Sequence, residues 1–286
     1  MTTVAVLGTG LMGAGMARSL ARAGLRVRVW NRTAERARAL AGGGIEVAED
    51  PQAAVHGADV IVTMLFDADA VEHVMGPVLE TLDARAVWAQ CATVGIETTE
   101  HLARVAESRG VAFVDAPVLG TRAPAENGQL IVVAGGPSAA RERVAEVFEA
   151  IGSRTVWVGE RPGDGHRLKL TLNAWVLSVT AATAQSVGLA EHLGVEPRLF
   201  LETIAGGPLD CAYAQLKGAA MIARDFTPSF TLAGAVKDAE LIERATSEEA
   251  SEARLMGALR GCFEAAARDA GDPSDLDMAA VVRAFT

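Results

Sequence analysis

The chain has 286 residues, half of them hydrophobic, which is enough to bury the core of one large domain or of two ordinary ones. Its formal net charge of −10, with no dense basic run among aromatic residues, argues against nucleic acid as a partner. Three widely spaced cysteines and five histidines without metal-ligand spacing predict neither a disulfide framework nor a metal site. Since no basic leader and no run of roughly 20 apolar residues is visible, we expect a cytoplasmic protein without a membrane partner.

Short β-branched runs alternate with amphipathic stretches from residue 3 to about residue 160, which is typical of a mainly parallel sheet covered by helices. The strand candidates are TVAVLG, LRVRVWN, IEVAE, ADVIVTML, RAVWAQ, VAFVDAPV, QLIVVAGG and TVWVG. The helix candidates are MARSLARAG, TAERARALAGG, PQAAVHG, TEHLARVAESRG and PSAARERVAEVFEAIG.

The pattern changes after Arg161-Pro162-Gly163. Residues 166–192 run without proline and with the apolar spacing of a long helix, and glycines and prolines divide the remainder into further helices. We therefore predict an α/β domain over residues 1–162 and an all-α part over residues 163–286.

A glycine motif follows the first strand. Gly8, Gly10 and Gly13 form GxGxxG at a turn that leads into a helix, which begins with Leu11 and Met12. The first glycine permits the tight turn, the second lets a pyrophosphate approach the backbone, and the third allows close helix packing. We predict a dinucleotide site; the alternative is a glycine-rich turn that binds nothing.

The second strand ends at Asn31, Arg32 and Thr33, where an NAD-selective site would usually carry an acidic residue for the ribose hydroxyls. An arginine beside amide and hydroxyl groups can instead neutralise a 2′-phosphate, so the sequence favours NADP(H) over NAD(H). The alternative is that Arg32 begins the next helix in solvent.

Lys169 lies in an otherwise apolar stretch, LKLTLNAWVL, with Asn173 one helical turn further on. Most lysines in such helices cover apolar surface with their stems while the amine reaches water. An ammonium in an apolar cleft, however, can stabilise and protonate the oxygen of a carbonyl that receives a hydride.

Four stretches together resemble the β-hydroxyacid dehydrogenase family, which includes 3-hydroxyisobutyrate dehydrogenase and the semialdehyde reductases. They are VLGTGLMGAGMARSLARAG, DAPVLGTRAPAENGQLIVVAGG, GDGHRLKLTLN and FTPSFTLAGAVKDAEL, in the family's order and over nearly the whole chain. The segment TRAPAENGQL is most similar to the glyoxylate/succinic semialdehyde reductase branch.

The resemblance implies a Rossmann-like, doubly wound α/β domain, a long interdomain helix and an all-α C-terminal domain like that of 6-phosphogluconate dehydrogenase. It also implies an active site between the domains and a homodimer or homotetramer packed through the helical half. Lys169 falls on the family's catalytic acid/base and Asn173 on the asparagine of the same GxGxxxKxxxN pattern, and both would also contact the substrate.

The same resemblance adds cofactor contacts from other parts of the chain. Thr93 would lie near the nicotinamide, and Lys237 would close the cofactor site; Met64 and Leu65 after the fourth strand complete the predicted set. The alternatives are that Thr93 caps a helix and that Lys237 is an ordinary solvated lysine beside Asp238.

The main departure from the family concerns the substrate. Members commonly read DAPVSGG, where the serine binds the substrate carboxylate, but this chain has Leu119 at that position, followed by Gly120 and Thr121. The latter two still offer donors, whereas leucine favours a larger or less polar group. We therefore predict a small-molecule substrate without naming it.

Other polar residues are more readily interpreted as structural than as catalytic. Tyr213, the only tyrosine, fits a packing role better than a proton donor. His166, one turn before Lys169, could tune that lysine or reach a substrate, but we expect it to lie in solvent at a helix start. Asp115 is expected to end its strand.

The sequence thus predicts an NADP(H)-dependent oxidoreductase that acts on a small aldehyde, keto acid or β-hydroxy acid. One alternative is imine reduction on the same architecture, against which the lysine counts, since imine reductases usually have Asp or Tyr there. The other is a sensor or scaffold that binds NADPH without turnover.

Overall fold

The computed structural model describes residues 1–246, 251–268 and 270–286. The chain divides into two compact units, Met1–Lys169 and Leu170–Thr286. The boundary predicted after residue 162 lies shortly before helix α8 (Asp164–His192), which begins in the first unit and continues into the second.

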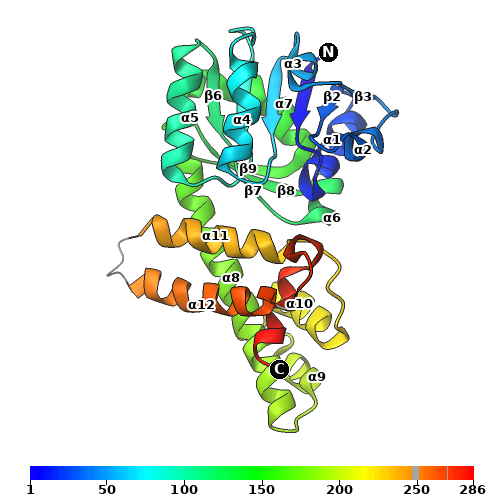
Figure 1. Ribbon diagram of the computed structural model, residues 1–286, viewed down its shortest axis with the longest axis vertical. Coiled ribbons are helices and arrows are strands. Elements are labelled where there is room, and N and C mark those ends of the chain that lie inside the picture. The colour runs from blue at the N-terminus through cyan, green and yellow to red at the C-terminus, as the bar shows by residue number, and fades with distance from the viewer. Residues whose placement is uncertain (247–250, 269) are drawn as a thin grey trace. The chain divides into compact units, whose positions relative to one another are not determined.

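The first unit is built on a nine-stranded sheet in the order β3-β2-β1-β4-β5-β6-β8-β7, with β9 also paired to β8 (Figure 1). The strands are β1 (Thr3–Leu7), β2 (Arg26–Trp30), β3 (Ile45–Val47), β4 (Val60–Thr63), β5 (Val87–Gln90), β6 (Ala112–Asp115), β7 (Val118–Leu119), β8 (Leu130–Gly135) and β9 (Gly152–Gly159). Every strand candidate forms a strand, and the predicted mainly parallel sheet is confirmed, with antiparallel pairing only where β8 meets β6 and β7. The single strand expected over VAFVDAPV is two, because Pro117 has no N–H to continue the ladder.

Helices cover both faces of this sheet (Figure 1). They are α1 (Leu11–Arg22), α2 (Ala34–Arg38), α3 (Pro51–Val55), α4 (Ala68–Leu79), α5 (Ile96–Ser108), α6 (Arg122–Glu126) and α7 (Ser138–Ile151). Alternate residues of β1 point to opposite sides: Val4 and Val6 join the core under α1 and α7, whereas Ala5 and Leu7 join the core under α3, α4 and α5. Burial on both faces explains why the strands read as nearly continuous apolar runs.

Two helices of the first unit, α4 and α6, were not among the predicted helices. The Asp67 side chain caps α4 by accepting the N–H of Ala70 at 2.9 Å. An aspartate at this position is a recognisable sign of a helix start, but Pro77 inside the helix interrupts the helical pattern of the sequence.

The second unit is helical throughout the residues that the structure describes, as predicted. Beyond α8 it contains α9 (Pro197–Ile204), α10 (Ala212–Ala223), α11 (Leu232–Arg244), α12 (Ser251–Arg268) and the 3-10 helices η1 (Pro273–Asp275) and η2 (Met278–Ala284). A buried ion pair between Lys217 and Asp277, 2.6 Å apart, joins α10 to the start of η2, and Asp277 also accepts the backbone N–H groups of Ser229 and Phe230 before α11. Among the described helices, none is long and apolar enough to cross a membrane.

Candidate dinucleotide and active site

The order of the strands locates a binding crevice in the first unit. From β1 the chain proceeds through β2 and β3 on one side, and then returns to place β4, β5 and β6 on the other. Ligands of open α/β sheets bind at such a switch point, beside the carboxyl ends of the strands. Gly8 follows β1 and Met64 follows β4 at this edge.

The glycine motif has the geometry that a dinucleotide requires. Gly8 has φ +103°, and a Cβ there would lie 2.3 Å from the Met64 carbonyl oxygen. A Cβ at Gly13 would lie 1.9 Å from the oxygen of Gly8, so neither position accepts a side chain. At Gly10, by contrast, a Cβ would meet no atom within 4 Å, which leaves open space in front of the N-terminus of α1.

Thr9 adds an observation that the sequence did not single out. Its side chain is buried, and its hydroxyl has no hydrogen-bond partner among the described residues. A buried hydroxyl without a partner is costly unless a ligand or water completes it. Together with the open space at Gly10, this loop fits the pyrophosphate of a bound dinucleotide.

Asn31 ties the glycine loop to the turn after β2. Its Oδ1 accepts the N–H of Thr9 at 3.0 Å, and its Nδ2 donates to the carbonyl of Thr33 at 3.0 Å. Arg32 and Thr33 are exposed beside it, and Arg32 has no ion-pair partner among the described residues. Arg36, four positions beyond Arg32 and within α2, is also exposed and was missed by the sequence analysis.

Met64 and Leu65, two of the predicted cofactor contacts, are half-buried directly after β4. A Cβ at Gly8 would touch the Leu65 side chain at 3.0 Å, and one at Gly13 would touch that of Met64 at 3.5 Å. The structure therefore brings these two residues and the glycine motif together.

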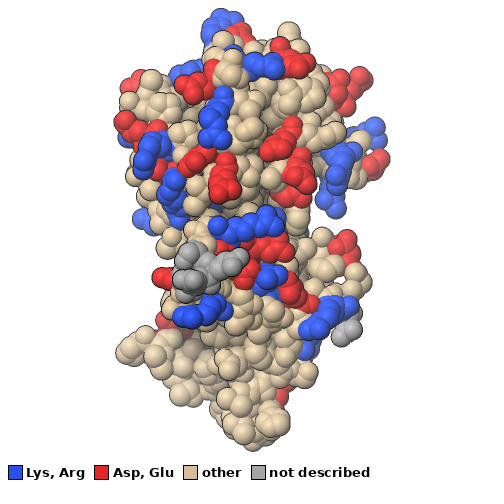
Figure 2. Space-filling view, turned by 60° about the vertical axis from the view of Figure 1, so that its left-hand side comes forward, with Lys and Arg blue, Asp and Glu red and all other residues tan. Residues whose placement is uncertain are grey.

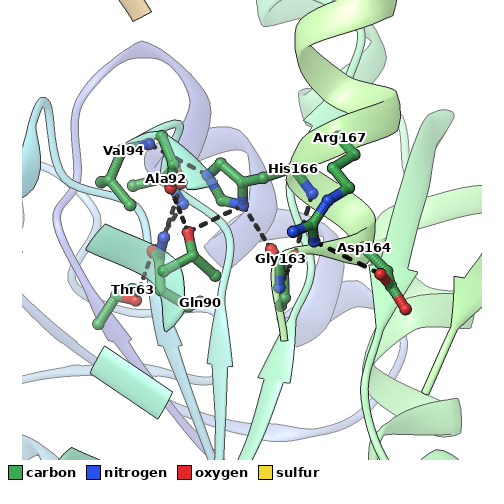
Figure 3. Close-up of polar contacts among 11 residues, drawn as sticks. Thr63, Gln90, Ala92, Val94, Gly163, Asp164, His166 and Arg167 are labelled. Carbon is green, nitrogen blue, oxygen red and sulfur yellow. Dashed lines mark hydrogen bonds and ion pairs between the residues drawn. The ribbon is translucent and has the colours of Figure 1, made fainter. Parts of the chain in front are cut away.

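The loop from β5 to α5 is anchored on either side of Thr93. Gln90, which is fully buried, binds both polar backbone groups of Ala92: its Oε1 accepts the N–H at 2.9 Å, and its Nε2 donates to the carbonyl at 2.7 Å. The N–H of Val94 donates to Nε2 of His166 at 3.1 Å (Figure 3). Thr93 is not a helix cap, because the residue before α5 is Gly95.

His166 corrects an expectation, since it is fully buried rather than solvated at the helix start. Its Nδ1 lies 2.5 Å from Oδ1 of Asp115, which ends β6 as predicted. Oδ2 of Asp115 accepts the N–H groups of Gly163 and His166 at 2.9 and 3.0 Å. The first turn of α8 is thus fixed to the end of β6.

Leu119, Gly120 and Thr121 follow one another from β7 into α6. Leu119 pairs with Ile131 of β8 and offers no polar side-chain atom. Gly120 has φ +135°, and a Cβ there would lie 2.7 Å from the Leu130 side chain, so the backbone requires glycine. Thr121 precedes α6 without capping it through its side chain.

Lys169 and Asn173 occupy successive turns of α8. Both are buried, with Lys169 7% and Asn173 1% exposed. Nδ2 of Asn173 donates to Oδ2 of Asp238 at 2.6 Å, and Nζ of Lys237 lies 2.8 Å from the other oxygen of that carboxylate. Asp238 therefore joins two predicted residues, a role that the adjacent letters KD in the sequence did not reveal. The Lys237 side chain is only 19% exposed, unlike a fully solvated lysine.

Comparison with known proteins decides the family. Residues 3–159 match the model for the NAD binding domain of 6-phosphogluconate dehydrogenase, and residues 163–285 match that for the NAD-binding domain of NADP-dependent 3-hydroxyisobutyrate dehydrogenase. Glyoxylate/succinic semialdehyde reductase 1 of Arabidopsis thaliana is 31% identical over 98% of this chain and 97% of its own length. The chain belongs to the β-hydroxyacid dehydrogenase family.

Solved structures agree with this assignment of a β-hydroxyacid dehydrogenase. The 3-hydroxyisobutyrate dehydrogenase of Mycobacterium tuberculosis, solved with L-serine, has 28% identity and a TM-score of 0.86 over 99% of this chain and 98% of its own. An imine reductase of Streptomyces aurantiacus, 22% identical, shares only the fold, with a TM-score of 0.63 over both whole chains. The protein is therefore an NAD(P)-binding dehydrogenase with a Rossmann-type sheet and a helical C-terminal part.

Within this dehydrogenase, Tyr213 has the surroundings of a packing residue. Its hydroxyl donates to the Met278 sulfur at 3.4 Å, and burial raises the pKa of the phenol above its ordinary value. A phenol that holds its proton more tightly is a poorer acid, which agrees with the packing interpretation. Among the described residues, no three metal-ligating side chains lie together.

Proposed function

We propose that this dehydrogenase is an NADP(H)-dependent reductase of a small aldehyde or keto acid, reversible as an alcohol dehydrogenase, with Lys169 as its general acid/base. The observation that supports it most is the buried Lys169, which lies one helical turn before Asn173 on α8. Taking an ammonium out of water is costly, and a proton donor held in such surroundings suits acid/base chemistry on a carbonyl oxygen.

When bound, the nicotinamide cofactor supplies or accepts the hydride. The Lys169 ammonium stabilises the negative charge that develops on the carbonyl oxygen and donates a proton to it. In the oxidation direction the neutral amine takes the proton of the alcohol. Asn173, whose amide orientation is fixed by Asp238, holds the lysine amine or the substrate oxygen in place.

The preference for NADP(H) rests on the turn after β2. Arg32 precedes α2 and Arg36 lies in it, both are exposed, and the adjacent Asn31 carries no charge that would repel a phosphate. Guanidinium groups bind phosphate oxygens through charge-assisted, often bidentate hydrogen bonds. We therefore propose that these two arginines bind the 2′-phosphate.

The proposal for the substrate rests on the side chain of Leu119. The relatives' names point to glyoxylate, succinic semialdehyde or 3-hydroxyisobutyrate, which all carry a carboxylate. Leu119 supplies no hydrogen-bond donor for such a group and adds apolar surface instead. We propose an aldehyde with a larger or less polar substituent than the family's usual substrates.

Leu119 is also compatible with a second function, imine reduction, because an imine substrate needs no carboxylate anchor and the imine reductases share the fold. Lys169 speaks against this function, since imine reductases usually have Asp or Tyr there.

A substrate panel tests the proposal. The purified protein is mixed with NADPH or NADH and with glyoxylate, succinic semialdehyde, uncharged aldehydes or cyclic imines, and absorbance of the reduced cofactor is followed. We expect NADPH to be oxidised with at least one aldehyde, and faster than NADH. Oxidation with imines alone would favour the second function, and tight NADPH binding without turnover of any compound would favour the sensor.

A further inference from the structure

A buried polar cluster to which the proposed function assigns no role lies at the start of α8. It consists of His166, Asp115 and Thr99, all of them fully buried, and we call it the His166 cluster. Its members come from α8, the end of β6 and α5, and it also binds the backbone of Val94 (Figure 3).

The hydrogen bonds of the His166 cluster determine which ring nitrogen carries the proton. Nε2 faces the N–H of Val94 and must accept, so it has no proton. Nδ1 therefore carries it and donates to Oδ1 of Asp115 at 2.5 Å. Thr99 Oγ1, 3.1 Å from Nδ1, donates its own proton to the carbonyl of Gly95 at 2.7 Å, which leaves it able to accept from the ring. The imidazole is thus neutral, and both nitrogens are used.

The His166 cluster joins the two segments that carry the proposed chemistry. Lys169 is one turn beyond His166 on α8, and Thr93 directly precedes Val94. Because Gln90 holds Ala92 on the other side, Thr93 lies between two anchored residues. His166 therefore links the β5–α5 loop around Thr93, which we call the Thr93 loop, to the helical turn that leads to Lys169.

Mere packing does not require this arrangement. A leucine at this position would fill buried space without the cost of taking an imidazole and a carboxylate out of water. A fully satisfied polar network instead specifies one arrangement of the elements that it joins. Such a network suits a place where two functional segments must keep a fixed spacing.

We propose that His166, held in its Nδ1–H form by Asp115, is a positioning residue that sets the spacing between the Thr93 loop and Lys169. This inference rests on the proposed function, in which Lys169 is the acid/base, and on the position near the nicotinamide that the family resemblance implies for Thr93. A displacement of about 1 Å between such groups costs about 100-fold in rate.

The first test needs neither cofactor nor substrate. Nitrogen-15 NMR of the ligand-free protein reports which nitrogen of each histidine ring is protonated, and the spectrum of His166→Asn identifies the His166 signals. We expect a protonated Nδ1 and an unprotonated Nε2, together with slow hydrogen exchange of the Val94 amide. A ring protonated on Nε2 would overturn the proposal.

The second test separates positioning from mere anchoring. His166→Asn keeps a side-chain N–H near the place of Nδ1 but loses the acceptor for Val94, and His166→Ala loses both. For both variants we expect kcat to fall by about 10- to 100-fold, with the smaller loss for asparagine, while the Kd of NADPH, measured by fluorescence titration, stays within about threefold. The primary isotope effect with deuterated NADPH should rise, because the slowed hydride transfer then limits turnover.

Arg167→Ala is the matched control. Arg167 follows His166 and also links α8 to α5, through Glu100 at 2.8 Å, but both side chains are partly exposed at 46% and 37%. Its loss should change kcat by less than about twofold. If the His166 variants kept the wild-type kcat and isotope effect although the Val94 amide exchanged faster, the cluster would be an anchor only. A wild-type protein that reduced no carbonyl compound would instead refute the proposed function, and the NMR result would still decide how His166 holds the loop.

Discussion

Arg32 lies exposed where β2 ends and has no ion-pair partner among the described residues. If it binds the 2′-phosphate of NADPH, Arg32→Ala should raise the Kd of NADPH about tenfold or more, because a charge-assisted hydrogen bond contributes roughly 1.5–3 kcal/mol. The Kd of NADH should not change. Arg38→Ala is the control, since Arg38 is on the same short helix but is exposed and pairs with Glu35 at 3.4 Å. Equal losses for the two cofactors would contradict the preference for NADP(H).

Leu119 offers the simplest test of substrate choice. Leu119→Ser would add a side-chain hydroxyl at this position, so kcat/KM for glyoxylate should rise at least about tenfold, the lower end of what one hydrogen bond to a charged group contributes. Leu119→Ala removes the bulk without adding a donor and should not reproduce the gain. A rise with alanine alone would mean that space, and not a carboxylate anchor, is what Leu119 controls.

The thiol of Cys91 should not react with thiol reagents in the folded protein. Burial, with the charge of Asp115 as a lesser cause, raises the pKa of its thiol to about 12. At pH 8 only about one molecule in ten thousand then carries the reactive thiolate. A thiol reagent such as DTNB should therefore titrate at most two of the three cysteines, Cys211 and Cys262, before the protein is unfolded. Three fast-reacting thiols in the native protein would contradict this burial.

Single residues differ in how far the sequence reveals them. Gly8 and Gly13 could be predicted, because the backbone geometry that demands glycine is set within a short segment. His166 could not, because its partners Val94 and Asp115 lie 72 and 51 positions away in the chain. A histidine after a glycine near a helix start looks the same whether it faces water or a buried carboxylate.

The β5–α5 loop depends on one buried side chain. Gln90 accepts the hydroxyl of Thr63 at 3.0 Å and binds both backbone groups of Ala92. Gln90→Leu leaves these groups without partners, so we expect a loss of about 1–3 kcal/mol in the free energy of unfolding, measured by denaturant titration. Gln129→Leu, at an exposed glutamine, serves as the control. Equal stability of the two variants would show that the loop does not need this anchor.

Whole elements were predicted where periodicity is strong. The strands that are buried on both faces and the long helix α8 have unbroken apolar patterns, and each was found. Helix α4 was missed because Pro77 interrupts its pattern, and one expected strand became β6 and β7 because Pro117 breaks the ladder. Pro117 changed the local structure, whereas Pro77 only obscured a helix that forms around it; the apolar pattern contains neither effect.

At the scale of the molecule, large apolar side chains are exposed mainly on the helical unit. They are Trp175, Leu189, Leu193, Val195, Leu199, Leu209, Leu216 and Leu255. Figure 2 shows a surface almost free of charged residues at the end that holds α9. Since apolar patches of this kind mark interfaces, we propose a homodimer or homotetramer that forms through this unit.

The double variant Leu189→Asp/Leu193→Asp tests this assembly. These two side chains are 52% and 65% exposed, so the substitutions should not disturb the fold of the subunit. We expect light scattering to give the mass of a dimer or tetramer for the wild type and that of a monomer for the variant. A wild-type monomer of 29.7 kDa at micromolar concentration would contradict the proposal.

The two-part architecture and the family were predictable from the sequence, because four motifs occur in the family's order along nearly the whole chain. The chemical role of the helical part is different, since it depends on residues such as Asp238, which holds Asn173 through a contact that spans 65 positions. No local pattern encodes such a contact.

The central claim is that Lys169 transfers the proton. Its most direct test is Lys169→Ala, assayed with the best aldehyde and NADPH, with the Kd of NADPH measured in parallel. We expect kcat to fall by about 10²- to 10⁴-fold, the usual contribution of a general acid, while the Kd of NADPH stays within about threefold. A variant that binds NADPH and keeps the wild-type rate would contradict the account.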